Sequence, residues 1–324
     1  MNELEQLICR LTNRQNCQLG ATIQSLWGGY GVIQRAQLTS DPLTHVVLKH
    51  IDLSEARQNR RGWGNDLSHE RKVKSYQVET HFYRHYADRC NNACRVPQLL
   101  AHHYEPGLDR RLLVFEDLDA SGFEVRKGRA TKIDLKACLS WLAHFHATFL
   151  QTPPEGLWPI GTYWHFETRP DEWRVMKSGQ LKELAGRIDS RLNECEFQTF
   201  VHGDAKIANF CFQPEGELVA AVDFQYVGGG CGIKDVVYFF SSCLEENEIE
   251  REEDWLLEYY FAKLETALKG MVSQVEFRRL ETEWRLLYPI AWADFVRFLE
   301  GWAPDHWKMN QYVLQLTKKA IQIL

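Results

Sequence analysis

The segment from residue 199 to residue 230 constrains this chain more than any other, because polar side chains follow two short apolar runs at fixed intervals. The first run, TFV, leads into a His-Gly-Asp turn that ends at Asp204, and Asn209 follows five residues later. The second run, LVAAV, leads directly into Asp223. Short apolar runs beside turn residues are typical of buried strands. We therefore expect two strands to bring two carboxylates and one carboxamide together.

These three groups suit phosphoryl transfer from ATP. Magnesium prefers oxygen ligands, and a further carboxylate can orient an attacking hydroxyl or accept its proton. The pattern therefore predicts Asn209 and Asp223 as ligands of Mg²⁺ and Asp204 as the catalytic residue. His202 is expected to brace the loop rather than to act as an acid or base.

The same segment resembles the aminoglycoside phosphotransferase, choline kinase and ecdysteroid kinase-like superfamily, whose members have His-Gly-Asp in place of the His-Arg-Asp of protein kinases. The runs VDFQ from Val222 and DVVYF from Asp235 look most like the choline-kinase-like and ecdysteroid-kinase-like branch. The resemblance implies an α+β, protein kinase-like fold with a small N-terminal lobe built on an antiparallel sheet and a larger, mainly helical C-terminal lobe. It also implies that Asp235 anchors the catalytic loop.

For the N-terminal lobe, the resemblance implies a strand lysine that binds ATP phosphates and pairs with a helix glutamate. Lys49 in HVVLKHI is the candidate lysine, Glu79 in VETHFY is the expected partner, and Glu70 is the competing one. Backbone N–H groups of a glycine turn would cover the phosphates. The residues expected to bind the nucleotide through this turn and through the hinge strand are Gly28, Gly29, Gly31, Phe115, Glu116 and Leu118.

The local patterns predict how the rest of the chain is organised. Apolar spacing predicts a helix over residues 1–14, followed by strands over 21–27, 31–38 and 45–51. Hairpin turns are expected at Gly28–Gly31 and at Ser40-Asp41-Pro42. A polar loop over 54–68, a helix, and a buried strand in RRLLVFEDL come next. We expect a nucleotide-binding lobe over 1–117 and a catalytic and acceptor-binding lobe over 118–324.

Charge and composition narrow the class of partner. A net charge of -6 argues against a dedicated nucleic-acid binder, which needs a basic surface. The nine cysteines show no metal-site spacing and suit reduced thiols. No secretory signal and no apolar run long enough to span a membrane is visible, so we expect a cytoplasmic location. We expect a small-molecule hydroxyl acceptor and no obligatory protein partner.

Three other functions compete with that of a small-molecule kinase. A pseudokinase scaffold would not need the full set of catalytic groups, and a protein kinase would need an Ala-Pro-Glu segment and a long activation loop, which the sequence lacks. A metal-dependent hydrolase would need paired His or carboxylate ligands.

The identity of the acceptor stays open. An aromatic cage for a quaternary ammonium competes with core packing for the C-terminal aromatic residues Trp284, Tyr288, Trp292, Trp302 and Trp307.

Overall fold

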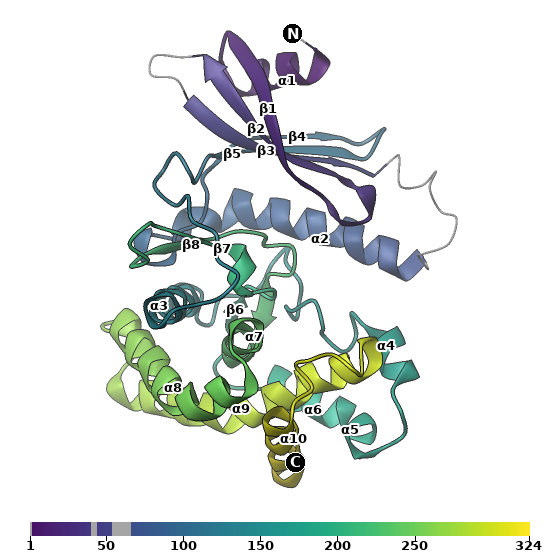
Figure 1. Ribbon diagram of the computed structural model, residues 1–324, viewed down its shortest axis with the longest axis vertical. Helices are drawn as coiled ribbons and strands as arrows, with labels where there is room; N and C mark the ends of the chain where they lie inside the picture. The colour runs from purple at the N-terminus through teal and green to yellow at the C-terminus, as the bar shows by residue number, and fades with distance from the viewer. Residues whose placement is uncertain (1, 40–43, 54–65) are drawn as a thin grey trace. The chain divides into compact units, whose positions relative to one another are not determined.

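The computed structural model describes residues 2–39, 44–53 and 66–324 (Figure 1). The expected turn Ser40-Asp41-Pro42 and most of the expected loop 54–68 lie outside these residues. Two compact units form: one combines Met1–Asp88 with Val96–Val125, and the other combines Arg89–Arg95 with Arg126–Leu324.

The first unit is built on a five-stranded antiparallel sheet with the order β1-β2-β3-β5-β4. The three strands expected at the start of the chain and the one expected in RRLLVFEDL are present. The strand LLAHHYE was not predicted, because its His and Glu residues weaken the apolar alternation that signals a strand. The strands are β1 (Asn16–Ser25), β2 (Gly31–Thr39), β3 (Thr44–Asp52), β4 (Leu99–Glu105) and β5 (Arg110–Glu116).

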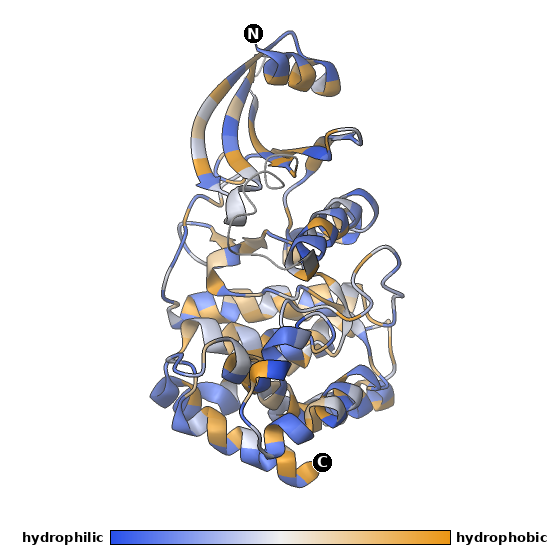
Figure 2. Cartoon of the chain, turned by 90° about the vertical axis from the view of Figure 1, so that its right-hand side faces the viewer, coloured by the Kyte–Doolittle hydropathy of each residue, from blue (hydrophilic) through white to orange (hydrophobic). Residues whose placement is uncertain are grey.

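A helix packs on each face of this sheet. Side chains alternate between the two faces of a strand, and Figure 2 shows blue and orange bands alternating along these strands. Helix α1 (Glu3–Thr12) contributes Ile8 to a core that contains Val46 and Leu48 of β3. Helix α2 (Asp66–His85) contributes Tyr76 to a core on the other face, which contains Ile51. Lys49 and Ile51 are two residues apart on β3, so their side chains lie on the same face of the sheet. Lys49 therefore faces α2.

The second unit is mainly helical. Helix α3 (Lys132–Thr148) packs on α8 (Glu246–Leu268), and α9 (Gln274–Trp302) contacts α7 (Ile233–Cys243) and α10 (Gln311–Ile323). Three shorter helices pack near α9: α4 (Pro170–Val175), α5 (Gln180–Glu183) and α6 (Ala185–Asn193). Two small antiparallel sheets pair β6 (Thr199–Val201) with β9 (Gly228–Gly230) and β7 (Phe210–Phe212) with β8 (Val219–Ala221).

The C-terminal aromatic residues divide between the interior and the surface. Trp284, Tyr288 and Trp292 are buried in α9, as core packing requires, whereas Trp302 is 55% and Trp307 57% exposed. A stretch rich in acidic residues, EENEIEREED, follows Leu244 and forms the N-terminal end of α8, where Glu248 pairs with Arg129. In the residues that the structure describes, no helix has both the length and the apolar character that crossing a membrane requires.

Candidate active site

A short hairpin brings Asn209 and Asp223 together in the second unit. Strands β7 and β8 pair with Phe210 opposite Ala221, so the residues just outside them also face each other. The Val222 N–H donates to the Asn209 carbonyl at 2.9 Å. Asp223, the next residue, therefore lies beside Asn209.

The loop between β6 and β7 brings Asp204 to the same place. The Asn209 side-chain amide donates to the backbone carbonyl of Asp204 at 2.8 Å and to its carboxylate at 3.1 Å. Both side chains are largely buried. Since its nitrogen faces Asp204, the Asn209 amide leaves its oxygen for another partner.

The conformation of this loop depends on Gly203. Its φ is +79°, a region that residues with a Cβ rarely adopt. A Cβ at this position would lie 2.1 Å from the Tyr226 carbonyl oxygen. The middle residue of the His-Gly-Asp turn is therefore a glycine for two steric reasons.

Asp235 and His202 fix the conformation of this loop through hydrogen bonds. The Asp235 carboxylate accepts hydrogen bonds from the backbone N–H groups of His202 at 2.5 Å and Gly203 at 3.0 Å. The His202 ring nitrogen Nε2 donates to the Val222 carbonyl at 3.1 Å, and Nδ1 accepts from the Asp204 N–H at 3.2 Å. Burial lowers the pKa of His202, which agrees with a neutral imidazole. His202 therefore braces the loop through both of its ring nitrogens.

Lys206 is a site residue for which the sequence analysis gave no role. Its ammonium lies 2.9 Å from the Asp204 carboxylate. Burial raises the pKa of Asp204, Lys206 opposes this, and the charge of Asp223 adds to the increase. Although burial lowers the pKa of Lys206, Asp204 and Asp223 raise it overall. The sequence does contain a signal for this role, because Lys206 lies within the motif, two residues after Asp204.

Asp223 has a strained backbone. Its φ is +71°, in the left-handed region, which costs energy in a residue other than glycine. The Gln225 side-chain amide donates to its carboxylate at 2.6 Å. Strain of this kind clusters at functional sites, and here it belongs to a predicted metal ligand.

In the first unit, Lys49 forms a buried ion pair with Glu79. The Lys49 ammonium lies 2.8 and 2.7 Å from the two carboxylate oxygens of Glu79, and both side chains are almost fully buried. Glu70 lies earlier on α2 and is exposed. The ammonium also lies 5.8 Å from the centre of the Tyr76 ring.

The glycine turn lies between β1 and β2. Gly28, Gly29 and Gly31 all have positive φ values. A Cβ on Gly31 would lie 2.0 Å from the His50 carbonyl oxygen, whereas one on Gly29 would meet nothing within 4 Å. The backbone conformation requires the glycine character of this turn, and close packing requires it at Gly31.

The expected hinge segment spans the end of β5 and the residues that follow it. Phe115 and Leu118 are buried, and the Glu116 carboxylate accepts from the Gln98 N–H at 2.6 Å. The Leu118 carbonyl accepts from the N–H groups of Ser121 and Phe123. Within the described residues the Leu118 N–H has no hydrogen-bond acceptor, so it can serve an adenine edge.

The predicted ligands fit a hard divalent ion. Asn209 presents an amide oxygen and Asp223 a carboxylate, the donor types that Mg²⁺ prefers. In the described part of the chain, no cluster of three or more His, Cys, Asp or Glu side chains is able to hold a metal. A site completed by phosphate oxygens and water needs no such cluster.

A family comparison agrees with this geometry. The model of the ecdysteroid kinase-like family matches residues 64–152 and 169–272. The chain belongs to this family. The match spans the Glu79 helix, the hinge, and the loop and hairpin that carry Asp204, Asn209 and Asp223. No curated protein matches the sequence.

Solved structures show that this ecdysteroid kinase-like protein has the kinase-like fold. Amicoumacin kinase in complex with AMP-PNP, Ca²⁺ and Ami is 13% identical, with 99% of this chain and 92% of that chain covered and a TM-score of 0.52. A candidate aminoglycoside phosphotransferase from Ralstonia eutropha is 12% identical, with 99% and 94% covered and a TM-score of 0.50. The expected superfamily and the α+β fold are therefore confirmed.

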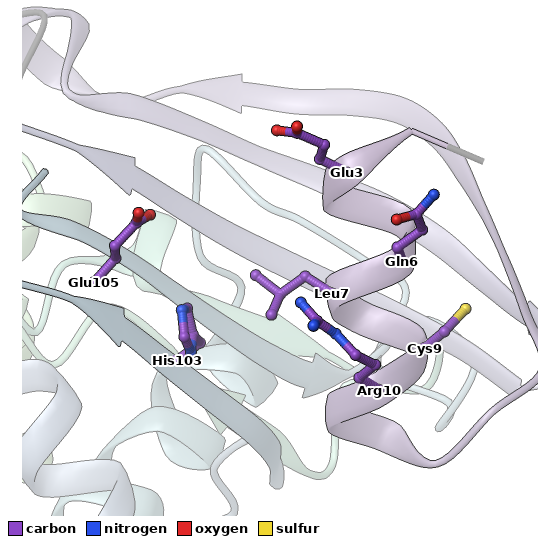
Figure 3. A pocket seen from close by; sticks show the side chains of 7 residues that line it. All are labelled: Glu3, Gln6, Leu7, Cys9, Arg10, His103 and Glu105. Atoms are coloured by element: carbon purple, nitrogen blue, oxygen red, sulfur yellow. The ribbon is translucent and has the colours of Figure 1, made fainter.

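A separate hollow lies on the first unit between α1 and β4 (Figure 3). It is on the α1 side of the sheet, whereas Lys49 faces α2, so it is distinct from the predicted nucleotide-binding residues. Its lining mixes both charges with apolar groups: Glu3, Gln6, Leu7, Cys9, Arg10, His103 and Glu105.

Proposed function

We propose that this protein is a kinase that uses ATP and Mg²⁺ to phosphorylate a hydroxyl group of a small molecule. The observation that carries the proposal is the hydrogen-bonded pair of Asp204 and Asn209 beside Asp223, in a member of the ecdysteroid kinase-like family. Amicoumacin kinase, which shares the fold, was solved with an ATP analogue and a divalent cation. Phosphoryl transfer needs mainly positioning and charge stabilisation, and these groups supply both.

In this proposal Asp204 accepts the hydrogen bond of the attacking hydroxyl and orients it. The carboxylate must be ionised to do so, and Lys206 favours the ionised form. Asn209 and Asp223 hold the divalent ion through oxygen atoms. When bound, the ion neutralises charge on the phosphates.

The nucleotide-binding groups of the first unit have separate roles. Lys49, held by Glu79, contacts the phosphates, and the N–H of Leu118 binds the adenine edge. The backbone of the glycine turn at residues 28–31 covers the phosphates. We further propose that residues 1–117 act as the nucleotide-binding lobe and 118–324 as the catalytic and acceptor-binding lobe.

The test is a screen of hydroxyl-bearing metabolites and antibiotics for acceptor-dependent ADP release. Asp204→Ala and Asp223→Ala are each expected to abolish release and to keep the wild-type circular dichroism spectrum. Asp171→Ala is the matched control, because Asp171 is a surface carboxylate paired with Arg174. Acceptor-dependent release by Asp204→Ala at the wild-type rate would contradict the assignment.

Calorimetry separates this proposal from a pseudokinase scaffold. A kinase should bind ATP more tightly with Mg²⁺ than without it, and the difference should vanish in Asp223→Ala. Tight, metal-independent ATP binding without ADP release from any acceptor would favour the scaffold instead.

A further inference from the structure

Lys308 places a cation among aromatic rings in the second unit. It lies in the segment between α9 and α10, and its ammonium is 5.2 Å from the centre of the Tyr238 ring and 5.4 Å from that of Phe295. The Trp307 ring centre is 5.7 Å away. The side chain has one hydrogen bond, a long one of 3.4 Å to the Ser241 hydroxyl. We call these five residues the Lys308 cluster.

The Lys308 ammonium lacks a carboxylate partner. In the part of the chain that the structure describes, no carboxylate lies within ion-pairing distance of it. Burial lowers its pKa to about 8, and the charge of Asp204 opposes that decrease. An ammonium has three donors, so at least one has no protein acceptor. Lys308 is half-buried, so its ammonium has lost part of its hydration without gaining an ion pair, and an anionic ligand would compensate for that loss.

The Lys308 cluster adjoins the predicted catalytic carboxylate. Burial together with the charge of Asp204 raises the pKa of Tyr238, so the two side chains lie near each other. Both Lys206 and Asp204 interact electrostatically with Lys308. A molecule whose hydroxyl meets Asp204 could therefore extend toward Lys308.

We infer that Lys308 determines acceptor specificity, and that the acceptor is an alcohol with an anionic oxygen group close to its reacting hydroxyl. This inference rests on the proposed role of Asp204. The ring faces that would attract a substrate ammonium already hold the ammonium of Lys308, so a second cation there is repelled. An anionic oxygen supplies both the missing hydrogen-bond acceptor and the missing countercharge. The net charge of -6 describes the whole chain and favours cationic partners in general, whereas Lys308 sets the charge that an acceptor meets at this cluster.

The test uses three alcohols that share a hydroxyethyl group on a tetrahedral head: isethionate is anionic, 3,3-dimethylbutan-1-ol is neutral and choline is cationic. Their binding to the full-length protein is measured by calorimetry without nucleotide, so the result does not depend on catalysis. Wild-type affinity is expected to fall in the order isethionate, 3,3-dimethylbutan-1-ol, choline. Lys308→Met should lower the affinity for isethionate by about tenfold or more and raise the affinity for choline. The affinity for the neutral alcohol should stay within about twofold of the wild-type value.

Lys182→Met is the matched control, because the Lys182 ammonium also lies near an aromatic ring, that of Trp173 at 5.8 Å. This variant should bind all three alcohols as the wild type does. The inference is overturned if isethionate does not bind or if choline binds at least as tightly as its neutral isostere. It is also overturned if Lys308→Met changes the affinities for all three alcohols by the same factor. Because no phosphate is transferred, such a failure would leave the proposed kinase activity standing.

Discussion

Lys206 offers the sharpest test of how the site keeps Asp204 ionised. The two groups are 2.9 Å apart, and because the Lys206 side chain is 39% exposed, a water-like dielectric sets the lower limit of their attraction. At that distance the attraction is about 1.4 kcal/mol, which corresponds to a roughly tenfold change in proton affinity. Removing the ammonium with Lys206→Met should therefore make Asp204 hold its proton about tenfold more tightly.

The consequence appears in the pH dependence of kcat/KM. Asp204 must be deprotonated to accept the hydroxyl proton, so activity falls as the pH drops through its pKa. Burial already raises this pKa, and loss of Lys206 raises it further. The acid limb in Lys206→Met should lie about one pH unit above that of the wild type.

Two variants control this experiment. Lys206→Arg keeps the charge and should restore the wild-type acid limb. Lys132→Met removes an exposed lysine that pairs with Glu252 at 3.3 Å, and it should change nothing. An acid limb in Lys206→Met that stays in place or moves to lower pH would refute the reasoning. A uniform loss of rate at every pH would show that Lys206 acts on another group.

The remaining predictions concern steric fit and the buried ion pair. Gly203→Ala should lower the melting temperature and abolish acceptor-dependent ADP release, because its Cβ would meet the Tyr226 carbonyl oxygen at 2.1 Å; wild-type release would contradict this. Glu79→Gln should lower the free energy of unfolding by about 3 kcal/mol, because it removes the carboxylate that pairs with the buried Lys49 ammonium. Denaturant melts measure this loss, and Glu70→Gln, an exposed change on the same helix, should leave stability within about 0.5 kcal/mol.

The sequence was sufficient to predict the arrangement of site residues that lie close together along the chain. The loop from His202 to Asn209 and the hairpin before Asp223 are short, so their spacing alone limits where the side chains can lie. The choice between Glu70 and Glu79 was also open to local reasoning. The two lie nine residues apart on α2, which is about two and a half turns, so they point in opposite directions. Glu79 shares its side of the helix with Tyr76 and Phe82, three residues away on either side, and both rings are buried.

The sequence was insufficient wherever distant segments meet. Lys308 follows Asp204 by about a hundred residues, and no motif connects them. Only the packing of α9 against α7 brings Phe295 and Tyr238 together around the lysine. The exposure of Trp302 and Trp307 could not be predicted either, because aromatic residues in the same stretch of sequence are buried.

The two lysines explain how the carboxylates of Asp204, which is buried, and Asp223, which is half-buried, can share one site. Asp204 and Asp223 disfavour each other's ionisation, and burial adds to the cost at Asp204. Lys206 compensates by direct contact, and Lys308 adds a weaker, through-space attraction. Lys206 already has Asp204 as its countercharge. Lys308 keeps donors for a ligand, so we assign charge balance to Lys206 and acceptor selection to Lys308.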